Sequence, residues 1–193
     1  DNGFQASISV KPTALGAAYN ELGSETRIIS IADKAWNAGL SIEVDMEARK
    51  YVELTLGLVR KLARTHRGSI SVALQAYLFR TPKDITDLSW DGASVRLVKG
   101  TYSGDIEEYA EIQTAMLDDL EILHSLGRPF SIGTHDPFLI EKVVKDRSMK
   151  GLVEIGTLKG LCDETKTYLV GKGWSVAEYV PYGADSRAYI ARR

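Results

Sequence analysis

The sequence predicts an α/β fold, namely a distorted (β/α)8 TIM-like barrel that lacks its first strand in this chain. Seven short β-rich runs alternate with amphipathic stretches, as in a parallel sheet covered by helices. Each apolar run ends at polar residues, and the chain contains neither GxGxxG nor GxxxxGK followed by Ser or Thr. A barrel gathers its strand ends at one mouth, whereas an open doubly wound sheet usually carries such a glycine-rich turn. These observations favour the barrel.

The seven predicted strands are short and rich in Ser, Val, Ile and Leu. They cover residues 6–10, 41–44, 70–76, 94–98, 130–133, 152–155 and 175–180. A closed barrel of this kind has eight strands and typically about 250 residues. One strand–helix unit is therefore expected to be missing from these 193 residues.

The clearest predicted helices cover residues 106–126 and 48–64. The apolar stripe of the first consists of Tyr109, Ile112, Met116, Leu120 and Leu123. The stripe of the second consists of Tyr51, Val52, Thr55, Leu58, Val59 and Leu62. Helices are expected to end near four glycines, because glycine tolerates the positive φ of a C-terminal cap: Gly39, Gly68, Gly127 and Gly173.

The composition is that of an ordinary globular domain, with 44% hydrophobic and 26% charged residues. A net charge of -2 and scattered basic residues argue against nucleic-acid binding. The single cysteine, Cys162, cannot form an internal disulfide, and no run of eighteen apolar residues occurs, so a cytoplasmic location is expected. No linker composition interrupts the chain, which predicts one domain over residues 1–193. Because the chain starts at Asp1 and stops at Arg193 just inside a predicted helix, we expect it to be a fragment.

Polar residues at the strand ends are candidates for chemistry at the barrel mouth. They are Lys11, Asp45, Gln75, Arg96 with Lys99, Thr134 with His135, Lys159 and Tyr179. Lys11 could be an ion-pair partner, a Schiff-base nucleophile or a surface residue, and spacing does not decide. Asp45 is expected to orient Lys11 or Arg96, while its neighbour Glu47 is expected to face solvent.

The last residues carry a second candidate site, in the spacing Tyr-x-x-Arg-Arg. Tyr189 and Arg192 would lie one helical turn apart, and Arg192 with Arg193 could clamp a carboxylate. A solvated helix end explains the same pattern. A metal site is not expected, because His66 and His124 lie on predicted helices away from the strand ends. His135 is interpreted as a hydrogen-bond donor to a cofactor or as a structural histidine, and Cys162 as a packed or bystander thiol.

Several segments, in order along the whole chain, resemble the proline dehydrogenase family, including the barrel domain of bifunctional proline-utilisation flavoenzymes. The segments are Ser-Val-Lys-Pro-Thr-Ala-Leu-Gly at 9–16, Val-Asp-Met-Glu at 44–47, Leu-Gln-Ala-Tyr-Leu at 74–78, Val-Arg-Leu-Val-Lys-Gly-Thr-Tyr at 95–102, Gly-Thr-His-Asp at 133–136, Tyr-Val-Pro-Tyr-Gly at 179–183 and Tyr-Ile-Ala-Arg-Arg at 189–193. Single motifs are weak, but the ordered series is specific.

The resemblance implies an FAD-dependent enzyme that oxidises L-proline to 1-pyrroline-5-carboxylate by hydride transfer to flavin N5. It assigns a catalytic role to Asp45 and to Arg96, the latter near flavin N5. It assigns the substrate pocket to Lys11, Leu158, Tyr179, Tyr189, Arg192 and Arg193. It assigns FAD binding to Met46, Gln75, Arg96, Val98, Lys99, Gly100, Thr101, Thr134 and His135.

The resemblance also implies a quinone as electron acceptor, and hence association with the periphery of the inner membrane; a homo-oligomer is a further expectation. The chain departs from the family pattern at Glu154-Ile155-Gly156, where Glu-Phe-Gln is usual, so a cofactor-side glutamine is lost. Two alternatives remain open at this stage. One is a Schiff-base lyase of the barrel type that uses Lys11 or Lys99, and the other is an inactive or scaffold barrel fragment.

Overall fold

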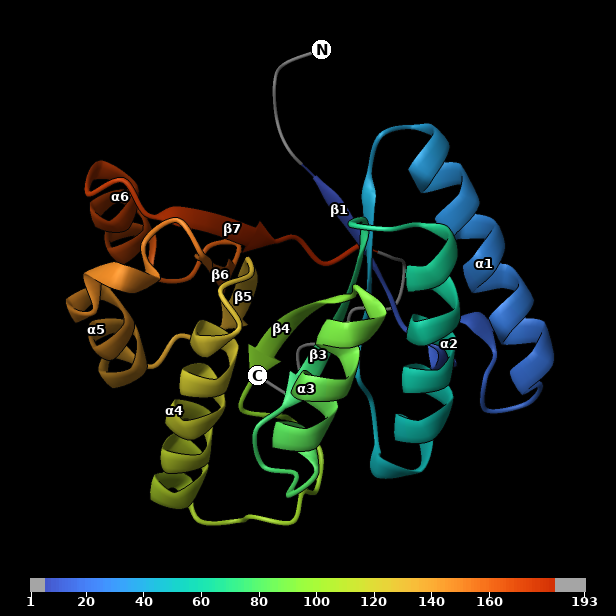
Figure 1. Cartoon of the computed structure of the whole chain (residues 1–193), viewed down its shortest axis with the longest axis horizontal. Helices are drawn as coiled ribbons and strands as arrows, with labels where there is room; N and C mark the ends of the chain where they lie inside the picture. Colours follow the sequence, from blue (N-terminus) through green and yellow to red (C-terminus); the bar gives the residue numbers. More distant parts are fainter. Residues whose placement is uncertain (1–5, 183–193) are drawn as a thin grey trace.

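The computed structural model describes residues 6–182, which form one curled sheet of seven parallel strands with helices outside it (Figure 1). The strands follow one another in chain order across the sheet. They are β1 (Ser7–Val10), β2 (Ser41–Val44), β3 (Ile70–Gln75), β4 (Ser94–Val98), β5 (Phe130–Gly133), β6 (Val153–Leu158) and β7 (Ser175–Tyr179). The predicted parallel barrel-type α/β fold is confirmed as a half-barrel, in which the described residues pair neither β1 nor β7 with a further strand.

A helix follows each of the first six strands. The helices are α1 (Glu21–Asn37), α2 (Val52–Thr65), α3 (Thr81–Asp91), α4 (Tyr109–Ser125), α5 (Pro137–Lys145) and α6 (Asp163–Gly171), with short 3-10 turns η1 (Thr13–Leu15), η2 (Arg49–Tyr51) and η3 (Arg147–Met149). The side chain of Asn20 caps the start of α1, and that of Asp136 caps α5. The four predicted glycines all have positive φ, between 63° and 78°, so the expected helix ends are confirmed.

The two faces of the sheet differ in polarity because side chains alternate along each strand. Residues such as Ile42, Val44, Leu97 and Ile132 point toward the helices and are fully buried in the hydrophobic core. The opposite, concave face carries small and polar side chains. Paired positions on it include Ser7 with Ser41, Glu43 with Ser71, Arg96 with Ser131 and Glu154 with Ser175.

Two sequence predictions about the elements are wrong. β6 runs to Leu158 rather than to residue 155, because Gly156 and Thr157 interrupt the apolar run without interrupting the pairing with β7. Tyr109 does not belong to the buried stripe of α4: it is 59% exposed, and its hydroxyl takes part in a polar cluster described below. The remaining strand and helix predictions agree with the structure to within a few residues at their ends.

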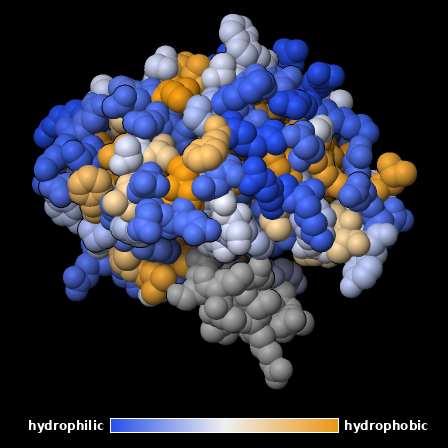
Figure 2. Space-filling model, turned by 90° about the horizontal axis from the view of Figure 1, so that it is seen from below, coloured by the Kyte–Doolittle hydropathy of each residue, from blue (hydrophilic) through white to orange (hydrophobic). Residues whose placement is uncertain are grey.

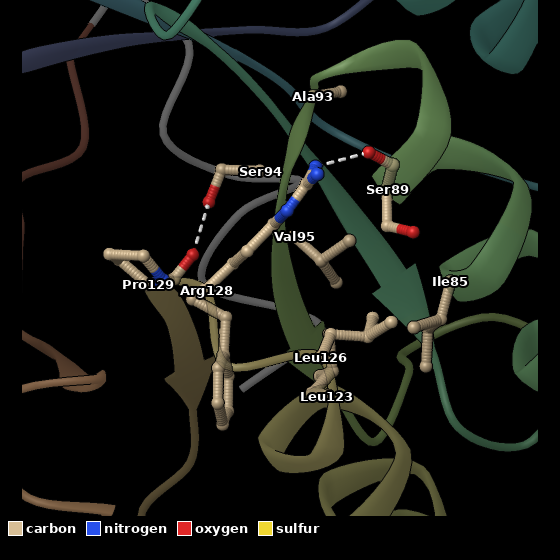
Figure 3. A pocket seen from close by; sticks show the side chains of 10 residues that line it. Ile85, Ser89, Ala93, Ser94, Val95, Leu123, Leu126, Arg128 and Pro129 are labelled. Carbon is tan, nitrogen blue, oxygen red and sulfur yellow. Dashed lines mark hydrogen bonds between the residues drawn. The ribbon is translucent and has the colours of Figure 1, made fainter.

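The face in Figure 2 is mostly hydrophilic, with apolar side chains scattered among charged ones. A small pocket between α3, β4 and α4 is bounded by Arg128, which donates to the Ser89 carbonyl, and by Ser94, which donates to the Pro129 carbonyl (Figure 3). Its volume of about 20 Å³ suits one water molecule. No helix within residues 6–182 has the length and apolar character needed to cross a membrane.

Candidate functional site

Arg96 lies at the centre of a charged cluster on the concave face of the sheet. Its Nη2 atom is 2.6 Å from Oδ1 of Asp45 and 3.0 Å from Oε1 of Glu43. All three side chains are largely buried. The sequence interpretation that Arg96 ends a strand is wrong, because β4 continues to Val98 and Arg96 sits at its middle position. The guanidinium therefore lies inside the half-barrel, at the depth of the two carboxylates.

Lys11 and Tyr179 complete this cluster from opposite edges of the sheet. Nζ of Lys11 is 3.7 Å from Oδ2 of Asp45, and the Tyr179 hydroxyl donates to the same oxygen at 3.5 Å. The guanidinium carbon of Arg96 is 5.5 Å from the centre of the Tyr179 ring, a cation–π contact. The structure brings the predicted strand-end residues Lys11, Asp45 and Tyr179, at the ends of β1, β2 and β7, together with Arg96 of β4. Leu158 pairs in register with Tyr179 and lies beside it.

A second polar cluster surrounds Asp136 at the start of α5. Its Oδ2 atom accepts hydrogen bonds from Nζ of Lys99 at 2.5 Å, from the Tyr109 hydroxyl at 2.6 Å and from Nε2 of Gln113 at 2.6 Å. Burial alone would raise the pKa of Asp136, but these hydrogen bonds outweigh it and hold the pKa well below its ordinary value. The Lys99 ammonium is therefore fixed in place by a carboxylate.

The predicted cofactor-binding residues lie on β3 and β4 and in the loops that follow β2, β4 and β5. Met46 and Gln75 are buried, and Nε2 of Gln75 donates to the Glu47 carbonyl at 3.3 Å. Thr134 accepts a hydrogen bond from the Asp136 amide at 3.1 Å. Nε2 of His135 accepts one from the Leu158 amide at 3.0 Å, so any donation to a ligand would come from Nδ1.

The loop after β4 is held against Tyr77. A side chain at Gly100 or at Gly104 would overlap the Tyr77 ring, and Gly100 also has a φ of 117°, a conformation that L side chains rarely adopt. The Tyr77 hydroxyl accepts a hydrogen bond from the Tyr102 amide at 3.1 Å. This packing sets the path of the loop that carries Lys99, Gly100 and Thr101.

Comparison with known proteins identifies the family. The sequence model described as "Proline dehydrogenase" matches residues 2–121. This chain belongs to the proline dehydrogenase family. Proline dehydrogenase 2 of Bacillus subtilis (strain 168) is 30% identical over 207 residues, covering 100% of this chain and 66% of the relative. Proline dehydrogenase of Deinococcus radiodurans is also 30% identical, covering 99% and 66%.

Solved structures of longer proteins also resemble this chain. Proline utilization A from Bdellovibrio bacteriovorus, inactivated by N-propargylglycine, superposes with a TM-score of 0.83 at 21% identity and covers 96% of this chain but 23% of that one. A mutant of proline utilization A from Bradyrhizobium japonicum gives a TM-score of 0.85 at 21% identity, with the same coverage. The barrel-type fold is therefore shared, and the chain spans 66% of the length of its curated proline dehydrogenase relatives.

Within this family member, one acidic residue does not behave as the sequence predicted. Glu47 was expected to face solvent, but it is buried and accepts hydrogen bonds from both the amide and the hydroxyl of Thr13, at 2.8 Å and 2.5 Å. It joins the loop after β1 to the loop after β2. That expectation is wrong because the two loops close over the carboxylate, which no local pattern could indicate.

Sequence reasoning missed Glu43 altogether. Burial raises the pKa of its carboxyl to about 7; Arg96 opposes the shift and Asp45 adds to it. The available signal was its position two residues before Asp45, because residues at that spacing on a strand share a face.

The other candidates from the sequence do not enter the two clusters. His66 contacts Asp33 at 2.9 Å, and His124 contacts Ser148 at 3.2 Å, so both lie away from the strand ends as expected. Cys162 is exposed rather than packed. Within residues 6–182 no group of three His, Cys, Asp or Glu side chains is arranged to hold a metal ion. Tyr189, Arg192 and Arg193 lie outside the residues that the structure describes.

Proposed function

We propose that this chain carries the catalytic barrel of an FAD-dependent proline dehydrogenase, which oxidises L-proline to 1-pyrroline-5-carboxylate as the first step of proline catabolism. The observation that carries the proposal is the meeting of Lys11, Asp45, Arg96 and Tyr179 on the concave face of a proline dehydrogenase fold. Cations, a carboxylate and an aromatic ring at that position suit a small zwitterionic substrate whose carboxylate must be held.

One feature of the described residues, an unpaired buried donor, is suited to a bound flavin. Nε of Arg96 is buried and has no hydrogen-bond partner among the described residues, so a buried donor is left for an acceptor atom. FAD would be held by Met46, Gln75, Arg96, Val98, Lys99, Gly100, Thr101, Thr134 and His135. When bound, FAD supplies the hydride acceptor, its N5 atom, for the hydrogen on C5 of proline.

The contribution of the protein is positioning and electrostatics. We propose that Lys11 attracts the carboxylate of proline, together with Arg192 and Arg193, and that Tyr179, Leu158 and Tyr189 wall its ring. Asp45 contacts both Lys11 and Arg96, so it fixes the spacing between the substrate side and the cofactor side of the site. A net positive surrounding would favour the neutral amine of proline.

The ion pairs favour this function over a Schiff-base lyase. A Schiff-base lysine must lose its proton to attack a carbonyl carbon. Nζ of Lys11 lies 3.7 Å from a carboxylate oxygen of Asp45, and Nζ of Lys99 lies 2.5 Å from one of Asp136, so each lysine is already engaged in an ion pair. Neither lysine is thereby prepared as a nucleophile.

The proposal has four further features, of which the quinone and the membrane association are what the family resemblance implies. They are a quinone as electron acceptor, peripheral association with the inner membrane from the cytoplasm, a homo-oligomer, and a single domain over residues 1–193. A single hydrophobic core that runs from β1 to Trp174 supports the last of these.

The test is an absorbance spectrum of the purified chain after addition of FAD, followed by anaerobic addition of L-proline. Retained flavin bands that bleach with proline are expected. A folded chain that retains no flavin would overturn the proposal for this chain and support the inactive barrel fragment.

A matched pair of variants tests the substrate side. Lys11→Met is expected to raise the KM for proline at least tenfold while flavin binding persists, because it removes a charge that faces the substrate carboxylate. Lys83→Met removes an equivalent charge from an exposed ion pair with Asp87 on α3 and should leave KM unchanged. Equal effects of the two substitutions would contradict the assignment of Lys11.

A further inference from the structure

Glu43 occupies the deepest position of the charged cluster. It lies on β2 two residues before Asp45 and on the same face, and it is 7% exposed. Its Oε1 atom contacts Nη2 of Arg96 at 3.0 Å, the same nitrogen that Asp45 contacts at 2.6 Å. One nitrogen of Arg96 therefore contacts two carboxylates. That of Asp45 follows the end of β2, and that of Glu43 lies nearer the start of the strand.

The charges of this cluster balance only when Glu43 is ionised. Lys11 and Arg96 supply two positive charges, and Asp45 and Glu43 supply two negative ones. Protonation of Glu43 alone changes the sum from zero to +1. Because the cluster is largely buried, this change is poorly screened by solvent.

Other groups around Glu43 come from several strands. Ser9 of β1 and Tyr179 of β7 both interact with Glu43, and Glu154 of β6 adds a more distant negative charge. The Ser9 hydroxyl is buried beside the Glu43 carboxyl. Burial is the largest influence on the carboxyl, and it raises the pKa to about 7 against the opposing effect of Arg96.

A polar cavity gives Glu43 access to solvent from the amino-terminal ends of the strands. Its volume is about 340 Å³, and its lining includes Glu43, Glu154 and the hydroxyls of Ser41, Ser71, Ser131 and Ser175. These serines lie on the concave face and alternate along their strands with apolar residues that point toward the helices. A polar space of this size is large enough to admit water. Glu43 can therefore exchange a proton on the side opposite to the strand ends, where Lys11 and Asp45 lie.

We propose that Glu43 is a positioning residue that holds Arg96 from the amino-terminal side and, by gaining or losing a proton through the serine-lined cavity, sets the net charge of the site. This inference rests on the proposed function in one respect, since the charge acts on the flavin that Arg96 would face. With Glu43 protonated, Arg96 presents an uncompensated positive charge that stabilises negative charge on a bound flavin. With Glu43 ionised, that stabilisation is weakened.

The first experiment needs neither flavin nor activity. The chain is labelled with ¹³C at the glutamate side-chain carboxyls, and their chemical shifts are followed by NMR from pH 4 to 9 in the wild type, Glu43→Gln and Glu154→Gln. One carboxyl is expected to titrate near pH 7 in the wild type and in Glu154→Gln, and to be missing in Glu43→Gln. Glu154→Gln is the matched control, because it lines the same cavity but is exposed and has no ion pair with Arg96. Persistence of that titration in Glu43→Gln, or its loss in Glu154→Gln, overturns the proposal.

The second experiment measures the midpoint potential of bound FAD between pH 6 and pH 8. In the wild type, the potential should fall more steeply with pH above 7 than below it. In Glu43→Gln, a neutral isostere of the protonated form, this extra slope should disappear, and the potential at pH 8 should be higher than that of the wild type. Equal slopes in the two proteins overturn the charge-setting role, whereas failure of both to bind FAD contradicts the proposed function and leaves the NMR result to decide the place of Glu43.

The variant Glu43→Asp distinguishes a purely structural role of Glu43 from the charge-setting role. This variant keeps the charge but shortens the side chain, so it should retain a titrating carboxyl while loosening the hold on Arg96. If Glu43 only filled space, Glu43→Gln would behave as the wild type at every pH, and that result would refute the inference.

Discussion

Replacing Asp119 by Asn is expected to raise the free energy of unfolding above pH 7 and to flatten its dependence on pH. Asp119 lies on the core side of α4 and is 1% exposed, and neither of its carboxylate oxygens has a hydrogen-bond partner among the described residues. Burial, helped by the neighbouring charge of Asp118, raises the pKa of Asp119 from 3.8 to about 7. The folded state thus binds this proton more tightly than the unfolded chain.

The magnitude follows from that difference in pKa. A displacement from 3.8 to about 7 corresponds to roughly 4 kcal/mol. Because the folded pKa is the higher one, the contribution to stability is fully present below pH 3.8 and is lost as the pH rises through 7. An Asn amide cannot ionise, and its burial without a partner costs about 1–3 kcal/mol, much as the burial of the neutral carboxylic acid does. Because these two costs largely cancel, Asp119→Asn should gain up to roughly 4 kcal/mol at pH 8.

The assay is urea unfolding of the wild type, Asp119→Asn and Asp118→Asn at pH 5, 6, 7 and 8, with the free energy obtained by linear extrapolation. Burial raises the pKa of Glu43 to about 7 as well, so the quantity to compare is the difference between variant and wild type at each pH. That difference should grow with pH for Asp119→Asn and stay small for the exposed Asp118→Asn. A constant difference for Asp119→Asn, or an equal trend for Asp118→Asn, would refute the reasoning.

Two further substitutions test the loops around the site. Gly100→Ala should lower the free energy of unfolding by about 1–3 kcal/mol from backbone strain alone, with a further loss from overlap with the Tyr77 ring. The control Gly57→Ala on α2, where nothing lies within 4 Å of the added carbon, should raise that free energy by about 0.5–1 kcal/mol. Urea unfolding at pH 7 measures both variants, and an unchanged stability of Gly100→Ala would contradict the packing of this loop against Tyr77. Asp136→Asn keeps the cap of α5 but loses the charge that holds Lys99, which should cost about 1–2 kcal/mol at pH 7. The pKa of Asp136 is depressed, so the extra stability of the wild type is present above the ordinary pKa of 3.8 and is lost as the pH falls through the depressed pKa. The free energies of unfolding of the two proteins should therefore converge on acidification. A difference that persists at low pH would be inconsistent with an ionic contribution.

The sequence by itself determined the fold class and the positions of the strands. Strand formation depends on short runs of β-branched residues, and helix ends depend on residues such as Gly39 and Gly127, so both are readable locally. It also indicated Lys11, Asp45 and Tyr179 as strand-end residues that a barrel would gather, and the structure brings them together. The ordered motifs along the chain also indicated the family.

Only the tertiary structure decided which polar residues face one another and at what depth. Glu43 and Arg96 are 53 positions apart in number, and their contact depends on the pairing of β2, β3 and β4 and on the curvature of the sheet. The contacts of Tyr109 and Glu47 likewise depend on the tertiary structure. The Tyr109 hydroxyl bonds to Asp136 instead of packing in the apolar stripe, and Glu47 is covered by two loops. Periodicity specifies the face of an element on which a side chain lies. The partner that it meets is specified by strand register and loop packing, which are properties of the whole chain.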